Sequence, residues 1–194
     1  AIVGGGVPQA AGFAWSARKA GTDAVSVTYF GDGAINIGSV LETFNLAAAW
    51  NLPLCFFIEN NRYAVSTNVE EVTAEPRLSA RGLGFNIPSW HVDGMDPLAV
   101  HLAMEEATAH MRAGNGPTMI EADVYRYFHQ NGPFPGSAFG YRTKAEEQEW
   151  KLRDAIALVV SHLVRRGILS NADIEASTKQ AQSLMSELGD ELLE

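Results

Sequence analysis

The stretch that decides the fold is Gly31-Asp32-Gly33-Ala34-Ile35-Asn36, which directly follows the apolar run 24–30. A second polar stretch, Glu59-Asn60-Asn61-Arg62-Tyr63, directly follows the apolar run 52–58. The residues between them, Ser39 to Trp50, carry apolar side chains at helical spacing. This order predicts a strand, a helix and a second parallel strand, with Asp32 and Asn61 at the two carboxyl ends. Open α/β sheets bind their ligands at that edge.

The chemistry of these two polar stretches suits a metal and a phosphate. Asn61 lies 29 positions after Asp32, and a carboxylate with an amide oxygen makes a site suited to Mg²⁺ and diphosphate oxygens. The glycines on either side of Asp32 let the backbone approach a phosphate closely. The start of the next helix would offer free N–H groups to an anion. Asn60 is expected to hold the turn. The simpler alternative is a tight strand-to-helix turn in which Asp32 is only a cap.

Working outward, the pattern predicts a doubly wound parallel sheet with a C-terminal helical extension. Ranges 90–92 and 118–125 are typical of further strands, and range 62–88 of a long loop or broken helix. Thr143 and Glu146 form a capping-box pair that opens a helix ended by Gly167. We interpret 1–194 as one domain, with 144–194 as its C-terminal helices. Further helices are expected over 8–19, 97–113 and 170–188.

Composition limits the function classes. The 194 residues carry a net charge of −9 and 46% hydrophobic residues, enough for one α/β domain with a core. The acidic balance argues against a nucleic-acid partner. No apolar run is long enough for a membrane span, and no signal-peptide pattern opens the sequence. The single cysteine, Cys55, is expected to be a small buried hydrophobe in a reducing compartment. The start at Ala1, without an initiator Met, suggests the carboxyl-terminal part of a longer polypeptide.

The combined pattern resembles a known family. A Gly-Asp-Gly, about 30 residues and an Asn-Asn pair resemble the signature of enzymes that use thiamine diphosphate. The longer string 31–67, with Asp93-Gly94-Met95-Asp96, Tyr125-Arg126-Tyr127 and Tyr141-Arg142-Thr143, is similar to the alpha subunit of the decarboxylating component of 2-oxo acid dehydrogenase complexes. This group includes the pyruvate, branched-chain and acetoin enzymes. The resemblance covers most of the chain.

The resemblance implies a thiamine diphosphate-binding fold, Mg²⁺ and an oxidative decarboxylation of a 2-oxo acid with acyl transfer to a lipoyl group. It also implies an alpha2beta2 heterotetramer, in which the beta subunit supplies an essential glutamate, and a lipoyl acyltransferase core as partner. The compartment would be the bacterial cytoplasm or the mitochondrial matrix. The loop after Tyr127 lacks the family's serine-rich stretch, so regulation by a dedicated kinase is not expected.

The resemblance also assigns residues. Asp32, the Asn61 side chain and the main-chain carbonyl of Tyr63 would ligate Mg²⁺, and the N–H groups of Gly33 and Ala34 would meet the diphosphate. Ile2 and Val3 match a segment that contacts the aminopyrimidine ring, although Ala1 replaces the family's glycine. His129 is the candidate catalytic histidine. Counting from Tyr127, however, the family's key histidine falls on Gln130, so either position could take that role.

Three alternatives stay open from the sequence. The chain could belong to an acetoin-cleaving or other thiamine diphosphate-dependent enzyme, because the His129 loop departs from the family pattern. It could be a non-catalytic subunit that binds a partner. General nucleotide binding is the third, but Gly4-Gly5-Gly6 does not spell the dinucleotide fingerprint after a strand.

Overall fold

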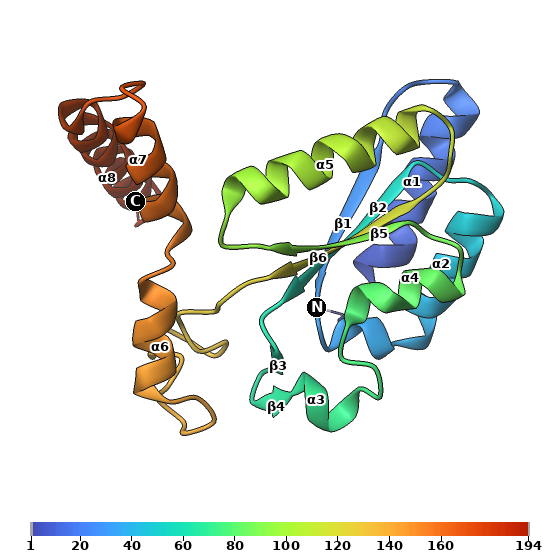
Figure 1. Ribbon diagram of the computed structural model, residues 1–194, viewed down its shortest axis with the longest axis horizontal. Helices are drawn as coiled ribbons and strands as arrows, with labels where there is room; N and C mark the ends of the chain where they lie inside the picture. The colour runs from blue at the N-terminus through green and yellow to red at the C-terminus, as the bar shows by residue number, and fades with distance from the viewer. Residues whose placement is uncertain (1, 194) are drawn as a thin grey trace. The chain divides into compact units, whose positions relative to one another are not determined.

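The computed structural model describes residues 2–193 and separates the chain into two compact units that divide after Leu152. The first unit contains a four-stranded sheet in the order β1-β2-β6-β5 (Figure 1). Its strands are β1 (Ser26–Gly31), β2 (Leu54–Asn60), β5 (Ser89–Asp93) and β6 (Thr118–Asp123). All neighbouring strands pair in parallel. The predicted α/β class with a parallel sheet is therefore confirmed.

The register aligns the carboxyl ends of the strands. Gly31 pairs with Glu59, and Asn60 pairs with Asp123, so the turns after β1, β2 and β6 start at one edge. Asp32 and Asn61 each follow directly after a strand at this edge, as predicted.

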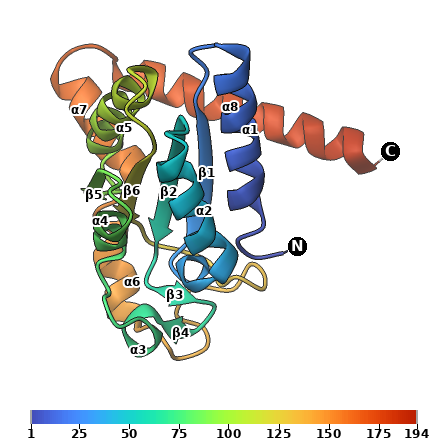
Figure 2. The same cartoon turned by 90° about the vertical axis from the view of Figure 1, so that its right-hand side faces the viewer.

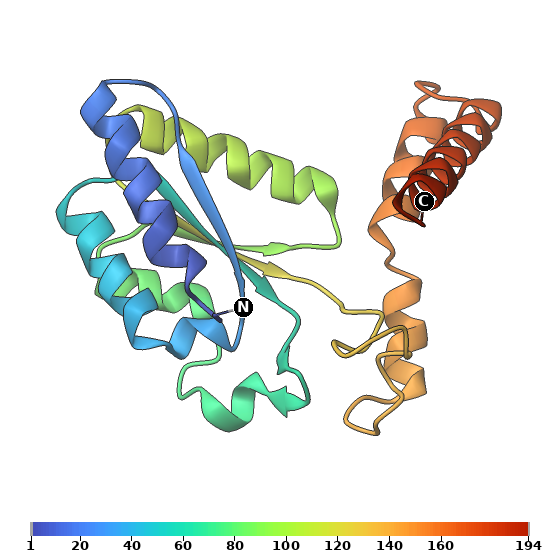
Figure 3. The same cartoon turned by 180° about the vertical axis from the view of Figure 1, so that it is seen from behind.

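Helices cover both faces of the sheet, which is the doubly wound arrangement. They are α1 (Gly6–Ala20), α2 (Gly38–Ala49) and α5 (Pro97–Arg112). Helices α1 and α2 pack in one buried cluster with Phe30, Phe44 and Phe56, whereas α5 packs on the other face against Phe57 and Ile120. Figure 2 shows α1 and α5 on opposite sides of β1 and β2, and Figure 3 shows α1 and α2 from behind. Because apolar side chains fill both faces of the sheet, the polar residues of the predicted site lie at the strand ends.

Range 62–88, predicted as a long loop or broken helix, folds into short pieces. These are β3 (Tyr63–Ala64), β4 (Thr67–Asn68), α3 (Val69–Val72), a 3₁₀ turn (Leu78–Ala80) and α4 (Arg81–Gly84). The segment lacks periodicity because only single residues reach the core. Val69, Leu78 and Ile87 are each almost fully buried and join the same cluster as α1 and α2.

The C-terminal region corrects one prediction. Instead of a single helix from Thr143 to Gly167, the structure has α6 (Lys144–Lys151) and α7 (Ala155–Arg165). The Thr143 cap is confirmed, since its hydroxyl accepts the N–H of Glu146. The chain breaks because the Asp154 carboxylate accepts the N–H groups of Ile156 and Ala157 and so starts a new helix.

The second unit, residues 153–194, holds α7 and α8 (Asn171–Leu193), while α6 belongs to the first. The assignment of 144–194 to the same domain as the sheet stays a prediction. Over residues 2–193, no helix is both long and apolar enough to cross a membrane.

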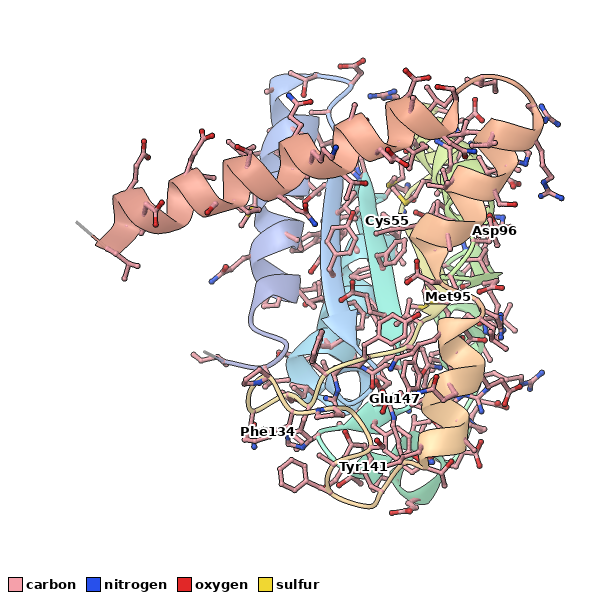
Figure 4. The ribbon with its side chains drawn as sticks, turned by 90° about the vertical axis from the view of Figure 1, so that its left-hand side faces the viewer. Cys55, Met95, Asp96, Phe134, Tyr141 and Glu147 are labelled. Atoms are coloured by element: carbon pink, nitrogen blue, oxygen red, sulfur yellow. The ribbon has the colours of Figure 1, made fainter. Side chains whose placement is uncertain are left out.

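Cys55 provides a pH-dependent test of the core. It is fully buried on β2 (Figure 4), and burial raises the pKa of its thiol from 9.0 to about 11. A raised pKa means that the neutral thiol contributes stability that is fully present below pH 9 and is lost as the pH rises through about 11. We expect Cys55 to resist a thiol reagent at about pH 8 in the folded chain, where the thiol is both buried and protonated, and to react fully in denaturant. Rapid labelling of the folded chain would contradict this prediction.

Candidate functional site

Asp32 is a buried carboxylate with a spare oxygen. The residue is 1% exposed, and the backbone N–H groups of Asp32 and Asn61 act on its carboxylate to lower its pKa. The buried Oδ2 atom has no hydrogen-bond partner. Burial raises the pKa of Asp32, whereas the two N–H donors and the charges of Arg126 and Arg142 oppose that rise. An unpartnered buried carboxylate oxygen is costly unless something else binds it.

The structure argues against the alternative that Asp32 is only a helix cap. A 3₁₀ turn, Ala34–Asn36, follows it, and α2 begins at Gly38. The residues at the two cap positions are Gly33 and Ile37, and neither helix start has a side-chain cap. Asp32 is therefore not a helix cap, and its burial needs another explanation.

The turn after β2 brings Asn61 and Tyr63 to the same place. Arg62 has a left-handed backbone, with φ +67°. The Asn60 side-chain oxygen accepts the N–H of Arg62 at 3.0 Å, so Asn60 holds the turn as expected. The Asn61 Oδ1 atom accepts the N–H of Tyr63 at 3.1 Å. The Asn61 backbone N–H also lowers the pKa of Asp32, so the two halves of the motif are close together.

Gly33 is required here by packing. A Cβ atom built on Gly33 would lie 2.7 Å from the Cβ of Ala64 in β3. The turn after β1 and the turn after β2 thus approach each other too closely for a side chain at position 33. Ala34, the other predicted diphosphate contact, is buried at the start of the 3₁₀ turn.

The first described residues lie beside this edge. Gly4 has φ +75°, and a Cβ built on it would lie 3.0 Å from Cδ1 of Ile37 and 3.1 Å from Cγ2 of Val40. The amino-terminal segment is therefore held against the start of α2, close after the Asp32 turn. Ile2 and Val3 are 87% and 69% exposed, so their side chains are open to a ligand. Ala1 lies outside the described residues.

Arg142 connects the loop after β6 to the Asn61 turn, a role that our reading of the sequence missed. The buried guanidinium donates to the carbonyl of Asn61 at 2.6 Å and to the carbonyl of Arg126 at 2.9 Å. It also lies over the rings of Tyr125 at 4.5 Å and Tyr63 at 4.7 Å. The signal in the sequence was an arginine embedded in a run of tyrosine-containing motifs.

His129 lies among the aromatic rings of the loop between β6 and α6. Its ring is 4.4 Å from that of Phe139 and 5.9 Å from that of Tyr141, and its Nδ1 accepts the N–H of Asn131. Figure 4 shows Tyr141 and Phe134 in this loop. Tyr141 also packs 5.1 Å from Tyr63, so one ring links His129 to the Asn61 turn. The neighbouring Gln130 accepts a hydrogen bond from Arg126. The catalytic role of His129 stays a prediction.

A second acidic group lies on β5 and β6. His91, Glu121 and Asp123 bring three candidate ligand atoms within 4.8 Å of one another. Each already has a protein partner: His91 pairs with Asp123 at 3.0 Å, and both oxygens of Glu121 accept hydrogen bonds. We therefore do not assign a metal to this group.

The fold and the site together define an α/β domain with a buried carboxylate and an asparagine turn at the carboxyl edge of a parallel sheet. Comparison with known proteins identifies the family to which this domain belongs. The chain belongs to the dehydrogenase E1 component family, whose model matches residues 1–191.

Individual relatives agree with this family. A pyruvate dehydrogenase E1 component subunit alpha from Rhizobium meliloti (strain 1021) is 40% identical over 190 residues, which is 97% of this chain and 54% of that protein. One of the same name from Staphylococcus aureus (strain Mu50 / ATCC 700699) is 37% identical, over 100% of this chain and 55% of its own length. The chloroplastic subunit alpha-3 from Arabidopsis thaliana is 34% identical, over 96% and 44%. The chain thus spans about half the length of the curated relatives it matches.

Proposed function

We propose that this chain is part of the alpha subunit of a thiamine diphosphate-dependent 2-oxo acid dehydrogenase, and that it holds the magnesium and diphosphate of that cofactor. The observation that carries the proposal is the Asp32 carboxylate. It is buried beside Asn61 and has one oxygen without a partner. A divalent cation bound there would give this oxygen a partner and offset the cost of burying the charge.

Each residue has a distinct part in the proposed site. Asp32 and the side chain of Asn61 would ligate Mg²⁺, together with the carbonyl of Tyr63. The backbone N–H groups of Gly33 and Ala34 would meet the diphosphate, a role supported by their place in the turn after β1. Ile2 and Val3 would contact the organic part of the cofactor, which their exposure beside this edge supports.

The proposed reaction is the oxidative decarboxylation of a 2-oxo acid with acyl transfer to a lipoyl group. Thiamine diphosphate, when bound, supplies the electron-withdrawing centre that makes loss of carbon dioxide possible. The names of the relatives favour pyruvate as the acid. His129 would assist acyl transfer by holding or moving a proton. The working unit would be an alpha2beta2 heterotetramer with a lipoyl acyltransferase core, because the essential glutamate is expected from the beta subunit.

The test is reconstitution of the chain, with the rest of its polypeptide, and a beta subunit of the same family. We expect thiamine diphosphate and Mg²⁺ to bind, and pyruvate to reduce lipoamide only when both are present. Lipoamide reduction with acetoin but with no 2-oxo acid would favour the acetoin-cleaving alternative. Failure of the assembled complex to bind the cofactor would favour a non-catalytic subunit. Competition of NAD or ATP with thiamine diphosphate would favour general nucleotide binding.

A further inference from the structure

Glu121 is a buried acidic residue near the carboxyl end of β6. It lies on β6, is 1% exposed and is on the same face of the sheet as Met119, which packs in the cluster that contains α1 and α2. Among the described residues, no arginine or lysine forms an ion pair with it. A buried carboxylate without a cationic partner is expensive, so it is kept only where its hydrogen bonds do something an apolar residue could not.

The first carboxylate oxygen holds the turn after β2. Glu121 Oε1 accepts the side-chain N–H of Asn60 at 2.8 Å. This bond sets the orientation of the Asn60 amide, so that its oxygen faces and accepts the N–H of Arg62 at 3.0 Å. Arg62 is the residue with the left-handed backbone between Asn61 and Tyr63. Glu121 thereby supports the turn that carries both of these proposed metal ligands.

The second oxygen reaches the other half of the site. Glu121 Oε2 accepts the backbone N–H of Ser79 at 2.7 Å, in the 3₁₀ turn Leu78–Ala80. Two residues later, the Arg81 guanidinium donates to the carbonyl of Ile35 at 3.0 Å and to the side-chain oxygen of Asn36. Ile35 and Asn36 belong to the 3₁₀ turn that follows Asp32. One buried carboxylate therefore connects, directly, to the turn that contains Asn61 and, through the Ser79–Arg81 segment, to the turn that follows Asp32.

We propose that Glu121 is a positioning residue that sets the distance between Asp32 and Asn61, and so the affinity of the site for a divalent cation. The inference rests on the proposed function, because it concerns the same site. This positioning role requires a carboxylate, since only a group with two accepting oxygens can accept both the Asn60 and the Ser79 N–H. A glutamine of the same shape would turn its own NH₂ group toward one of these donors.

Exchanging the acid at position 121 with the amide at position 60 distinguishes a positioning role of Glu121 from a general loss of stability. In Glu121→Gln, one hydrogen bond becomes a donor–donor clash, and in Asn60→Asp two carboxylates face each other. In the double variant, the glutamine NH₂ group at position 121 donates to the new carboxylate at position 60. That carboxylate still accepts the N–H of Arg62, and the glutamine oxygen still accepts the N–H of Ser79. Thr118→Val is the matched control, because Thr118 is a buried polar residue on the same strand, outside this network.

The measurement is the affinity of the reconstituted full-length protein for Mn²⁺ in the presence of thiamine diphosphate, read from the spectrum of free Mn²⁺. We expect each single variant to lose about 10- to 100-fold in affinity, the range known for residues that orient metal ligands. The double variant is expected to return to within about 3-fold of wild type, because coupled neighbours are non-additive. Thr118→Val should bind as wild type does.

A measurement without ligand tests the positioning role of Glu121 separately from the proposed function of the site. Amide hydrogen exchange of Arg62 and Ser79 should become faster in each single variant and return to the wild-type rate in the double variant. If wild type fails to bind Mn²⁺ but the exchange pattern holds, the proposed function is wrong and Glu121 still positions the two turns. If wild type binds and the double variant binds no better than either single variant, the positioning role is overturned. Unchanged exchange at Arg62 in Glu121→Gln would overturn it as well.

Discussion

Replacing Asp32 by alanine is expected to abolish binding of thiamine diphosphate with Mg²⁺ and to leave the folded protein at least as stable as before. The carboxylate is the only group of the proposed site that is both buried and anionic, so no other oxygen replaces it. We expect the affinity to fall by more than about 100-fold, beyond the range seen for residues that merely orient ligands. Calorimetric titration with the beta subunit present measures this loss.

The second half of this expectation concerns stability. Asp32 Oδ2 is buried without a partner, and burial raises the pKa of the carboxyl group, so the ionised side chain opposes folding when no metal is bound. Removing it should leave the metal-free free energy of unfolding in urea unchanged or increased. Asp23→Ala is the control, since Asp23 is exposed before the amino end of β1 and should affect neither quantity. A variant that unfolds easily but still binds the cofactor would contradict both halves.

Replacing Arg142 by methionine is expected to cause a large loss of stability, in contrast to Asp32→Ala. Methionine keeps an unbranched apolar stem, but the guanidinium is lost, and with it two hydrogen bonds to the carbonyls of Asn61 and Arg126 and the contacts to the tyrosine rings. Two carbonyls then lose a charged donor. We expect the free energy of unfolding to fall by about 3 kcal/mol, in line with hydrogen bonds to charged groups. Urea unfolding of the metal-free protein measures it.

Arg77→Met provides the comparison for this change. Arg77 also makes short bonds to a partner, at 2.8 Å to Glu75, but both side chains are largely exposed. Exposed pairs contribute little because water already solvates both charges. We expect Arg77→Met to leave the unfolding midpoint nearly unchanged. Equal losses for Arg142→Met and Arg77→Met would show that the tyrosine-lined environment of Arg142 adds nothing.

The parts of the fold that were predictable depend on local patterns. Apolar runs of strand length before Asp32 and Asn61, with a helical pattern between them, were enough to predict β1, α2 and β2. The capping pair at Thr143 was predicted for the same reason, because a cap involves residues three positions apart. The pattern failed at Asp154, where the apolar stripe of α7 resembled a continuation of α6. A single aspartate, whose carboxylate accepts two N–H groups, was enough to divide them.

The residues of the candidate site also divide into those that local sequence patterns predict and those that depend on distant partners. Asp32 and Asn61 were predicted from the sequence because each follows a predicted strand, and Tyr63 was predicted from the family resemblance. Arg142 and Glu121 were not found, because their importance lies in partners far along the chain. Arg142 reaches Asn61 across 81 positions, and Glu121 reaches Asn60 across 61 and Ser79 across 42.

The sequence by itself thus determined the main strands and helices of the sheet region, the edge of the sheet at which Asp32 and Asn61 meet, and the family resemblance. The elements and the edge follow from periodicity and spacing, which act over a few residues and need no knowledge of packing. The resemblance follows from the quoted motifs. The tertiary structure alone decided that Asp32 is buried with a spare oxygen and that Gly33 has no room for a side chain. It also decided that Glu121 accepts hydrogen bonds from Asn60 and Ser79, and that Arg142 donates to the carbonyl of Asn61. Burial and hydrogen-bond partners depend on which segments the folded chain brings together, and no local pattern records that choice.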